Sequence, residues 1–132
     1  RKVIYGIGTD ICDVQRVDRL YQKFGQRFLG KILSVQEKQQ LPFTERAGWL
    51  AKRWAAKEAF AKALGTGFGA GLHFYDFAVV NNNKGAPEPV LTQNAQQKLP
   101  PQANVHVSLS DEKGYAMAFV VIEHCFNQEK GI

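Results

Sequence analysis

Two glycines alternate with apolar residues near the start of the chain, in the stretch YGIGTD. The pattern predicts a β-strand over residues 3–9, and a strand sends alternate side chains to opposite faces. Asp10 therefore shares a face with Gly6 and Gly8. Because a glycine within a strand often marks the close approach of another backbone or of a ligand, this face is expected to accept such a contact. The sequence equally allows Asp10 to cap a helix or turn that begins near residue 13.

The length and composition predict one ordinary globular domain. The chain has 132 residues, of which 45% are hydrophobic and 22% charged, and we expect a single domain over residues 1–132. Cys12 and Cys125 are too few for a disulfide framework and lack metal-finger spacing, so both are expected to be reduced thiols. The sequence begins at Arg1 and shows neither an apolar leader nor a long apolar run, so a cytoplasmic protein without a membrane span is expected.

The charge balance points to an acidic partner. Seventeen Lys and Arg residues against twelve Asp and Glu residues give a net charge of +5. Such a charge favours nucleic acid, an anionic cofactor or an acidic protein, and a solvated basic surface without a partner is the alternative.

Four basic residues form a stripe along a predicted helix and the segment that follows it. Asp13 is expected to cap a helix over residues 14–24, and Gly25 interrupts it. If helical geometry roughly continues, two stripes form, and the basic one is either a docking surface or a solvated face. The basic stripe holds Arg16, Arg19, Lys23 and Arg27, and the apolar stripe holds Val17, Tyr21, Phe24 and Phe28.

The remaining patterns predict an α+β fold. SVQE (residues 34–37) has the capping-box pattern of a short helix, and the longest helix follows over residues 45–64. Strands are predicted over 74–81 and 88–92, a short helix over 93–99, and two late strands form a hairpin around DEKG. Helices mostly in the first half of the chain should therefore pack on a largely antiparallel sheet.

The long helix has a large apolar face and an opposite strip of small residues. The apolar face holds Trp49, Leu50, Trp54, Phe60 and Leu64, and the strip holds Ala51, Ala55 and Ala59.

Glu58 and Lys62 lie within or beside the strip. Packing of the glycine-bearing strand face on this strip would bring Asp10 and Glu58 together. Two carboxylates at one place repel unless a cation or a proton lies between them, and Mg²⁺ is the natural candidate. The alternative is an ordinary Glu58–Lys62 pair on a helix surface.

Other polar residues leave more than one interpretation open. Arg53 and Lys57 interrupt the apolar face, so they either reach out to solvent or bind a phosphate-rich ligand. The loop GTGFGAG lacks the ending of a Walker loop, but its backbone amides could contact an anion. His106 shares a strand face with two serines, which indicates a polar sheet face and not a hydrolase triad.

Four stretches together resemble a known family. They are YGIGTDICDVQRV, LAKRWAAKEAFAKALGTG, GAPEP and HVSLSDEKGYAMAFVVIE, in family order over almost the whole chain. The sequence resembles the bacterial holo-[acyl-carrier-protein] synthases of the 4′-phosphopantetheinyl transferase superfamily. The hallmarks are an aspartate in G-[IL]-G-x-D, matched by Asp10, and a glutamate in W/F-x-x-K-E-A-x-x-K, matched by Glu58.

The resemblance implies the 4′-phosphopantetheinyl transferase-like fold, a reaction and an assembly. It implies transfer of the 4′-phosphopantetheine arm from coenzyme A to a serine of apo acyl carrier protein, with release of adenosine 3′,5′-bisphosphate, in fatty acid biosynthesis. It also implies Mg²⁺ as cofactor and a homotrimer with active sites at subunit interfaces. The acidic carrier protein would then explain the net charge without nucleic acid.

The resemblance also assigns residues by motif position. Asp10 and Glu58 would hold the metal, and Glu58 would take the serine proton or orient a water. Lys62 would lie near the transferring phosphate. The coenzyme A site would be lined by Arg53, Lys62, Gly65, Thr66, Gly67, Pro87 and His106, and the carrier protein would dock on Arg16, Arg19, Lys23 and Arg27.

One departure and three rivals remain. Asp111 stands after SLS, a neighbourhood where other members carry a second histidine, so no catalytic role is expected for this turn. A nucleic-acid-binding module should show stacking aromatics among its cations or a recognisable binding motif, and the sequence shows neither. A Mg²⁺ nuclease commonly places its lysine two residues after an acid on a strand, whereas Lys62 follows Glu58 by four on a helix. A catalytically silent scaffold would show no turnover.

Overall fold

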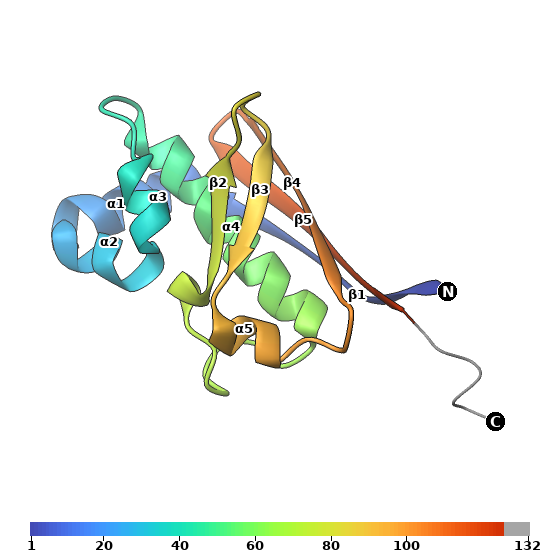
Figure 1. Ribbon diagram of the computed structural model, residues 1–132. Helices are drawn as coiled ribbons and strands as arrows, with labels where there is room; N and C mark the ends of the chain where they lie inside the picture. Colours follow the sequence, from blue (N-terminus) through green and yellow to red (C-terminus); the bar gives the residue numbers. More distant parts are fainter. Residues whose placement is uncertain (126–132) are drawn as a thin grey trace.

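The structure is a computed structural model that describes residues 1–125. Its helices gather on one side of two antiparallel sheets, as the α+β prediction requires (Figure 1). In chain order the elements are β1 (Lys2–Asp13), α1 (Val14–Phe24), α2 (Gln26–Ile32), α3 (Val35–Gln39), α4 (Arg46–Leu64), a 3-10 turn (Phe74–Asp76), β2 (Phe77–Asn81), β3 (Pro87–Leu91), α5 (Gln93–Gln97), β4 (Asn104–Glu112) and β5 (Tyr115–Cys125).

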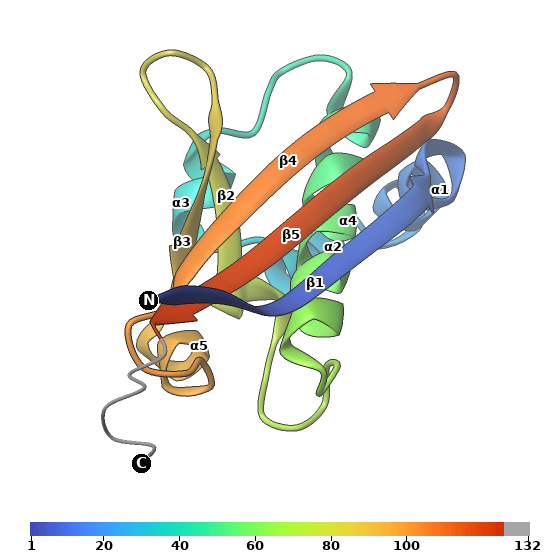
Figure 2. The same ribbon diagram turned by 90° about the vertical axis from the view of Figure 1, so that its right-hand side faces the viewer.

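The strands form two separate sheets. The three-stranded sheet has the order β1-β5-β4, and β2 pairs only with β3 in a two-stranded hairpin. Figure 2 shows the three-stranded sheet in front of α4, with the β2–β3 hairpin beside it. We call the face toward α4, which carries Gly6, Gly8 and Asp10, the inner face, and the opposite face, which carries Ile11 and Phe119, the outer face.

Close packing of β1 on α4 explains the alternating glycines. A Cβ atom added to Gly8 would overlap the carbonyl oxygen of Ala59, and one added to Gly6 would overlap that of Ala63. The strand backbone therefore lies directly on the helix backbone. The predicted strip of small residues is buried here, and Ala63 extends it by one turn.

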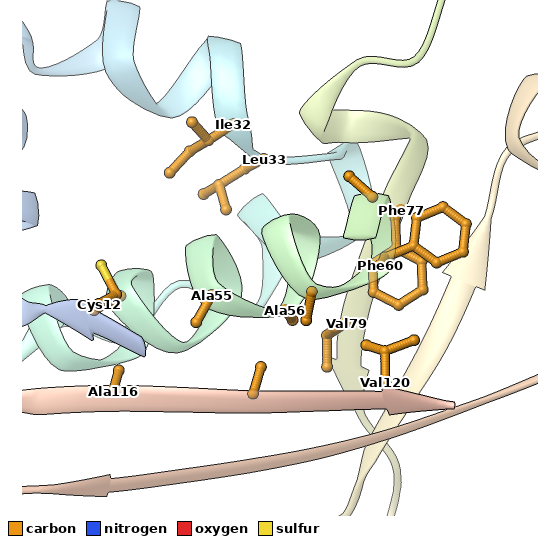
Figure 3. Packing of buried hydrophobic residues seen from close by; sticks show 14 of the residues in the cluster. Cys12, Ile32, Leu33, Ala55, Ala56, Phe60, Phe77, Val79, Ala116 and Val120 are labelled. Atoms are coloured by element: carbon orange, nitrogen blue, oxygen red, sulfur yellow. The ribbon is translucent and has the colours of Figure 1, made fainter. Parts of the chain in front are cut away.

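The core lies between α4, the sheets and the short helices. Figure 3 shows Ala55 and Ala56 of α4 above the sheet, and the rings of Phe60 and Phe77 lying face to face. Those two ring centroids are 4.2 Å apart with an interplanar angle of 7°. Leu50, Phe60 and Leu64 of the predicted apolar face are buried, whereas Trp49 and Trp54 stay partly exposed.

Local signals predicted the helix ends well. The carboxylate of Asp13 accepts a hydrogen bond from the Gln15 amide, and Ser34 forms the predicted capping box with Glu37. Several bounds differ from the prediction: the helix predicted over 93–99 ends at Gln97, and the strand predicted over 88–92 spans Pro87–Leu91. The first strand continues to Asp13, because Asp10 to Asp13 keep pairing with β5, and residues 74–76 form a 3-10 turn instead of strand.

The glycine contact predicts a large difference between two Gly→Ala variants. Gly8→Ala should destabilise the protein by more than about 3 kcal/mol, because the new methyl group meets helix backbone that cannot move aside. Gly30→Ala is the matched control, since nothing lies within 4 Å of its added Cβ within helix α2. It should stabilise by about 0.5–1 kcal/mol through helix propensity. Urea unfolding measures both, and a Gly8→Ala protein as stable as wild type would contradict the contact.

Candidate active site

The packing of β1 on α4 brings three predicted residues together. Asp10 projects from the inner face, and Glu58 and Lys62 lie one turn apart on α4. Lys62 Nζ lies 3.1 Å from Asp10 Oδ1 and donates a 3.0 Å hydrogen bond to the Thr9 carbonyl oxygen. Lys62 of α4 is therefore paired with Asp10 of β1.

Glu58 lies close enough to Asp10 for their charges to interact. Burial raises the pKa of Glu58, and the negative charge of Asp10 raises this pKa further. The positive charges of Lys62 and Arg16 oppose both effects without cancelling them. A second cation at this place would therefore be favourable.

These two carboxylates fit a hard divalent cation. Mg²⁺ is typically held by one or two carboxylates and completes its shell with water and substrate phosphate oxygens. Within residues 1–125, no group of three or more His, Cys, Asp or Glu side chains is arranged to hold a metal. An ion at Asp10 and Glu58 would thus need oxygens from a ligand or from water.

Arg53 and Lys57 do not reach out to solvent, so that interpretation was wrong. Both are buried, with 2% and 0% of their surface exposed. Lys57 Nζ lies 2.8 Å from Glu37 Oε1 and donates to the Phe77 carbonyl oxygen at 2.6 Å. Burial lowers the pKa of Lys57, and the charge of Glu37 opposes this effect.

The guanidinium of Arg53 is likewise used within the chain. It donates to the Val79 carbonyl oxygen at 3.3 Å and to Asn81 Oδ1 at 3.2 Å, and it lies 4.2 Å from the ring centroid of Trp49. Burial lowers its pKa to about 10. Its predicted contact with coenzyme A stays a prediction.

The buried pair predicts unequal effects for two lysines of α4. Lys57→Met should destabilise the protein by about 3–5 kcal/mol, because Glu37 would keep a buried charge without its partner. Lys52→Met is the control. Its pair with Asp111 is solvent-exposed, so the loss should stay below about 1 kcal/mol. Equal losses in denaturant unfolding would refute the buried pair.

The glycine loop follows α4 directly. The amides of Gly65 and Gly67 donate to the carbonyl oxygen of Ala61, and Gly65 also reaches that of Lys62. These bonds close the helix end, and the predicted contact of the loop with a cofactor stays untested. Pro87 opens β3 and pairs with Asn81 of β2.

His106 lies apart from the carboxylates. Its side chain is on the outer face of β4, where its Nε2 atom lies 2.6 Å from Glu123 Oε1. The two serines of this strand share that face, as predicted. Asp10 is on the inner face, so within one copy of the chain His106 lies on the other side of the sheet from Asp10.

The predicted basic stripe surrounds exposed aromatic surface. Arg16 lies 5.8 Å from the ring centroid of Trp54, while Lys23 and Arg27 flank the ring of Phe24 at 5.3 and 5.9 Å. Phe24 is 39% exposed, so the predicted apolar stripe is only partly core. Beside it runs an apolar groove of about 250 Å³, lined by Leu20, Phe24, Arg27, Phe28, Lys31, Ile32, Trp54 and Phe74.

The sequence analysis missed the second role of Glu37. It predicted only that Glu37 caps α3, and the pairing of Glu37 with Lys57 had no local signal, because the two residues are 20 positions apart.

Among the helices of residues 1–125, none is long and apolar enough to cross a membrane.

Comparison with known proteins identifies the class. A family model described as the 4′-phosphopantetheinyl transferase superfamily matches residues 6–120. The chain therefore belongs to this superfamily.

The individual relatives and solved structures that the chain resembles are holo-[acyl-carrier-protein] synthases. The chain is 43% identical over 130 residues to a holo-[acyl-carrier-protein] synthase of Sphingopyxis alaskensis, covering 92% of this chain and 97% of the relative. It is similar to the crystal structure of holo-[acyl-carrier-protein] synthase from Neisseria meningitidis, with a TM-score of 0.80, 40% identity and coverage of 91% and 98%. The Helicobacter pylori enzyme, solved in complex with coenzyme A, matches with a TM-score of 0.77, 30% identity and coverage of 88% and 98%.

Proposed function

We propose that this protein is a holo-[acyl-carrier-protein] synthase that moves the 4′-phosphopantetheine arm from coenzyme A to a serine of apo acyl carrier protein. The observation that carries the proposal is the meeting of Asp10, Glu58 and Lys62 at the β1–α4 contact. We place the reaction in fatty acid biosynthesis in the cytoplasm, as the family resemblance of the sequence implies.

The proposed reaction exchanges one P–O bond for another. The serine oxygen attacks the phosphorus that bears the pantetheine arm, the P–O bond to the second phosphate breaks, and adenosine 3′,5′-bisphosphate leaves. The serine proton must move to a base, and negative charge grows on the leaving phosphate.

The residues of this chain match those needs. Asp10 and Glu58 would hold Mg²⁺, which neutralises charge on the two phosphates when it is bound. Glu58 is our choice for taking the serine proton or for orienting a water, because its carboxylate lies at the place where Mg²⁺ and the phosphates would bind. Lys62, 55% exposed and next to Asp10, would place its ammonium near the leaving phosphate.

We propose that the coenzyme A site extends from these residues along neighbouring loops. The lining residues are those expected from the family resemblance: Arg53, Lys62, Gly65, Thr66, Gly67, Pro87 and His106. The solved Helicobacter pylori relative with coenzyme A supports this donor.

The carrier protein would dock on α1 and the start of α2. Arg16, Arg19, Lys23 and Arg27 supply positive charge for an acidic partner, and the apolar groove beside Phe24 offers a place for an apolar side chain.

We further propose a homotrimer with active sites between subunits. The outer face exposes large apolar side chains that a monomer would leave in water, among them Ile7 at 58%, Ile11 at 63% and Phe119 at 44%. His106 lies on this same face, so contact between copies would let one copy supply His106 to the active site of another.

The trimer is tested by charging the outer face. Phe119→Asp should convert a species of about three times the 14.8 kDa chain mass into monomer, because a buried carboxylate at the interface would lack a partner. Phe43→Asp is the control, since Phe43 is 95% exposed on the loop before α4. Analytical ultracentrifugation gives the masses, and a monomeric wild-type protein would contradict the assembly.

The activity is tested by the intact mass of apo acyl carrier protein incubated with this protein, coenzyme A and Mg²⁺. A mass gain of one phosphopantetheine arm is expected. The gain should vanish with EDTA and fall at least about 100-fold in rate with Glu58→Gln, because the metal clamp and the carboxylate base act together. No gain with folded wild-type protein and several carrier proteins would overturn the proposed activity.

A further inference from the structure

The free edge of β2 is covered by side chains instead of by another strand. β2 pairs with β3 on one side. On the other side, the backbone groups of the alternate residues Phe77, Val79 and Asn81 point toward α3 and α4. A strand edge normally presents such unpaired N–H and C=O groups to solvent or to a further strand.

The buried part of this edge is held by charged residues. The Val79 amide donates to Glu37 Oε2 at 2.9 Å, and the Val79 carbonyl oxygen accepts from Arg53 at 3.3 Å. Lys57, which is paired with Glu37, donates to the Phe77 carbonyl oxygen. Two helices thereby hold the strand through hydrogen bonds to its backbone.

Gln40 completes the edge at its exposed end. The Asn81 amide donates to Gln40 Oε1 at 2.8 Å, and Gln40 Nε2 donates to the Asn81 carbonyl oxygen at 3.1 Å. The side-chain amide therefore replaces the peptide group that a neighbouring strand would offer. Asn81 is the last residue of β2, so this pair is made where the chain enters the turn that leads to Pro87.

These contacts act together with core packing, since Phe77 and Val79 are buried and the ring of Phe77 stacks on Phe60. The hairpin is not hydrogen-bonded into the three-stranded sheet. At its opposite end the two strands are joined to each other: the Asp76 backbone carbonyl accepts from the Thr92 amide at 3.0 Å, and the Asp76 carboxylate accepts from the Thr92 hydroxyl at 2.7 Å. The turn end is held by Gln40 and by the contact of Arg53 with the Asn81 side chain.

We propose that Gln40 is a positioning residue for coenzyme A: it fixes the turn end of the β2–β3 hairpin, and so Pro87, relative to the helix that carries Glu58. This inference rests on the proposed function. Gln40 lies at the C-terminal cap of α3 and touches neither the carboxylates nor Lys62 through a hydrogen bond. Its effect is therefore on the binding of the donor and not on the chemical step.

The test compares initial rates for Gln40→Ala and Gln39→Ala at saturating carrier protein. Gln40→Ala should raise the KM for coenzyme A about three- to tenfold with kcat within about twofold of wild type, which is the pattern of lost uniform binding. Gln39 is the exposed neighbour at the end of the same helix, and Gln39→Ala should leave both constants unchanged. Gln40→Glu keeps the acceptor and loses the donor, so its KM should lie between those of wild type and Gln40→Ala.

Amide hydrogen exchange provides the second readout. Exchange at Asn81 should become at least about tenfold faster in Gln40→Ala, while exchange in β5 stays unchanged, since only the hairpin end is released. An unchanged KM in Gln40→Ala, a kcat lowered by more than about twofold, or unchanged exchange at Asn81 would overturn the role of Gln40 alone. A wild-type protein that transfers no arm would overturn the proposed function and this inference with it.

Discussion

The structure depends on the contact between the backbones of β1 and α4. Gly6 and Gly8 have no side chain to separate the strand from Ala59 and Ala63, so the helix lies directly on the inner face. Side chains at the edge of so close a contact have little freedom. Asp10, two positions after Gly8, therefore comes next to residues of the helix, and the electrostatics of the candidate site follow from the packing of small residues that hold no charge themselves.

The same helix uses its opposite side to hold the β2–β3 hairpin. Lys57 and Arg53, buried among apolar residues, satisfy backbone groups of β2 together with Glu37. Two consecutive residues of α4 thus have different roles. Lys57 contacts the hairpin, whereas Glu58 lies close to Asp10. A rigid helix between the two keeps the carboxylates at a constant position relative to the hairpin.

Local patterns in the sequence predicted the elements that depend on nearby residues. The alternating glycines and the alanine strip predicted the β1–α4 contact, because both periodicities are visible within one element. The burial of Arg53 and Lys57 was not predictable in this way, since their partners Glu37, Val79 and Asn81 lie 20 to 28 positions away. The separation of the hairpin from the main sheet likewise depends on tertiary packing. The expected donor, the expected carrier protein and the proposed role of His106 came from the family resemblance and not from these patterns.

The most direct test of the account is the titration of the Glu58 carboxyl by NMR, without metal, in wild type and in Asp10→Asn. The account predicts a pKa above the ordinary value of about 4.3 in wild type, and a lower pKa once the charge of Asp10 is removed. Asp13→Asn, which removes an exposed charge from the cap of α1, should leave the pKa of Glu58 unchanged. A pKa of Glu58 that is the same in wild type and in Asp10→Asn would show that the two carboxylates do not share one site.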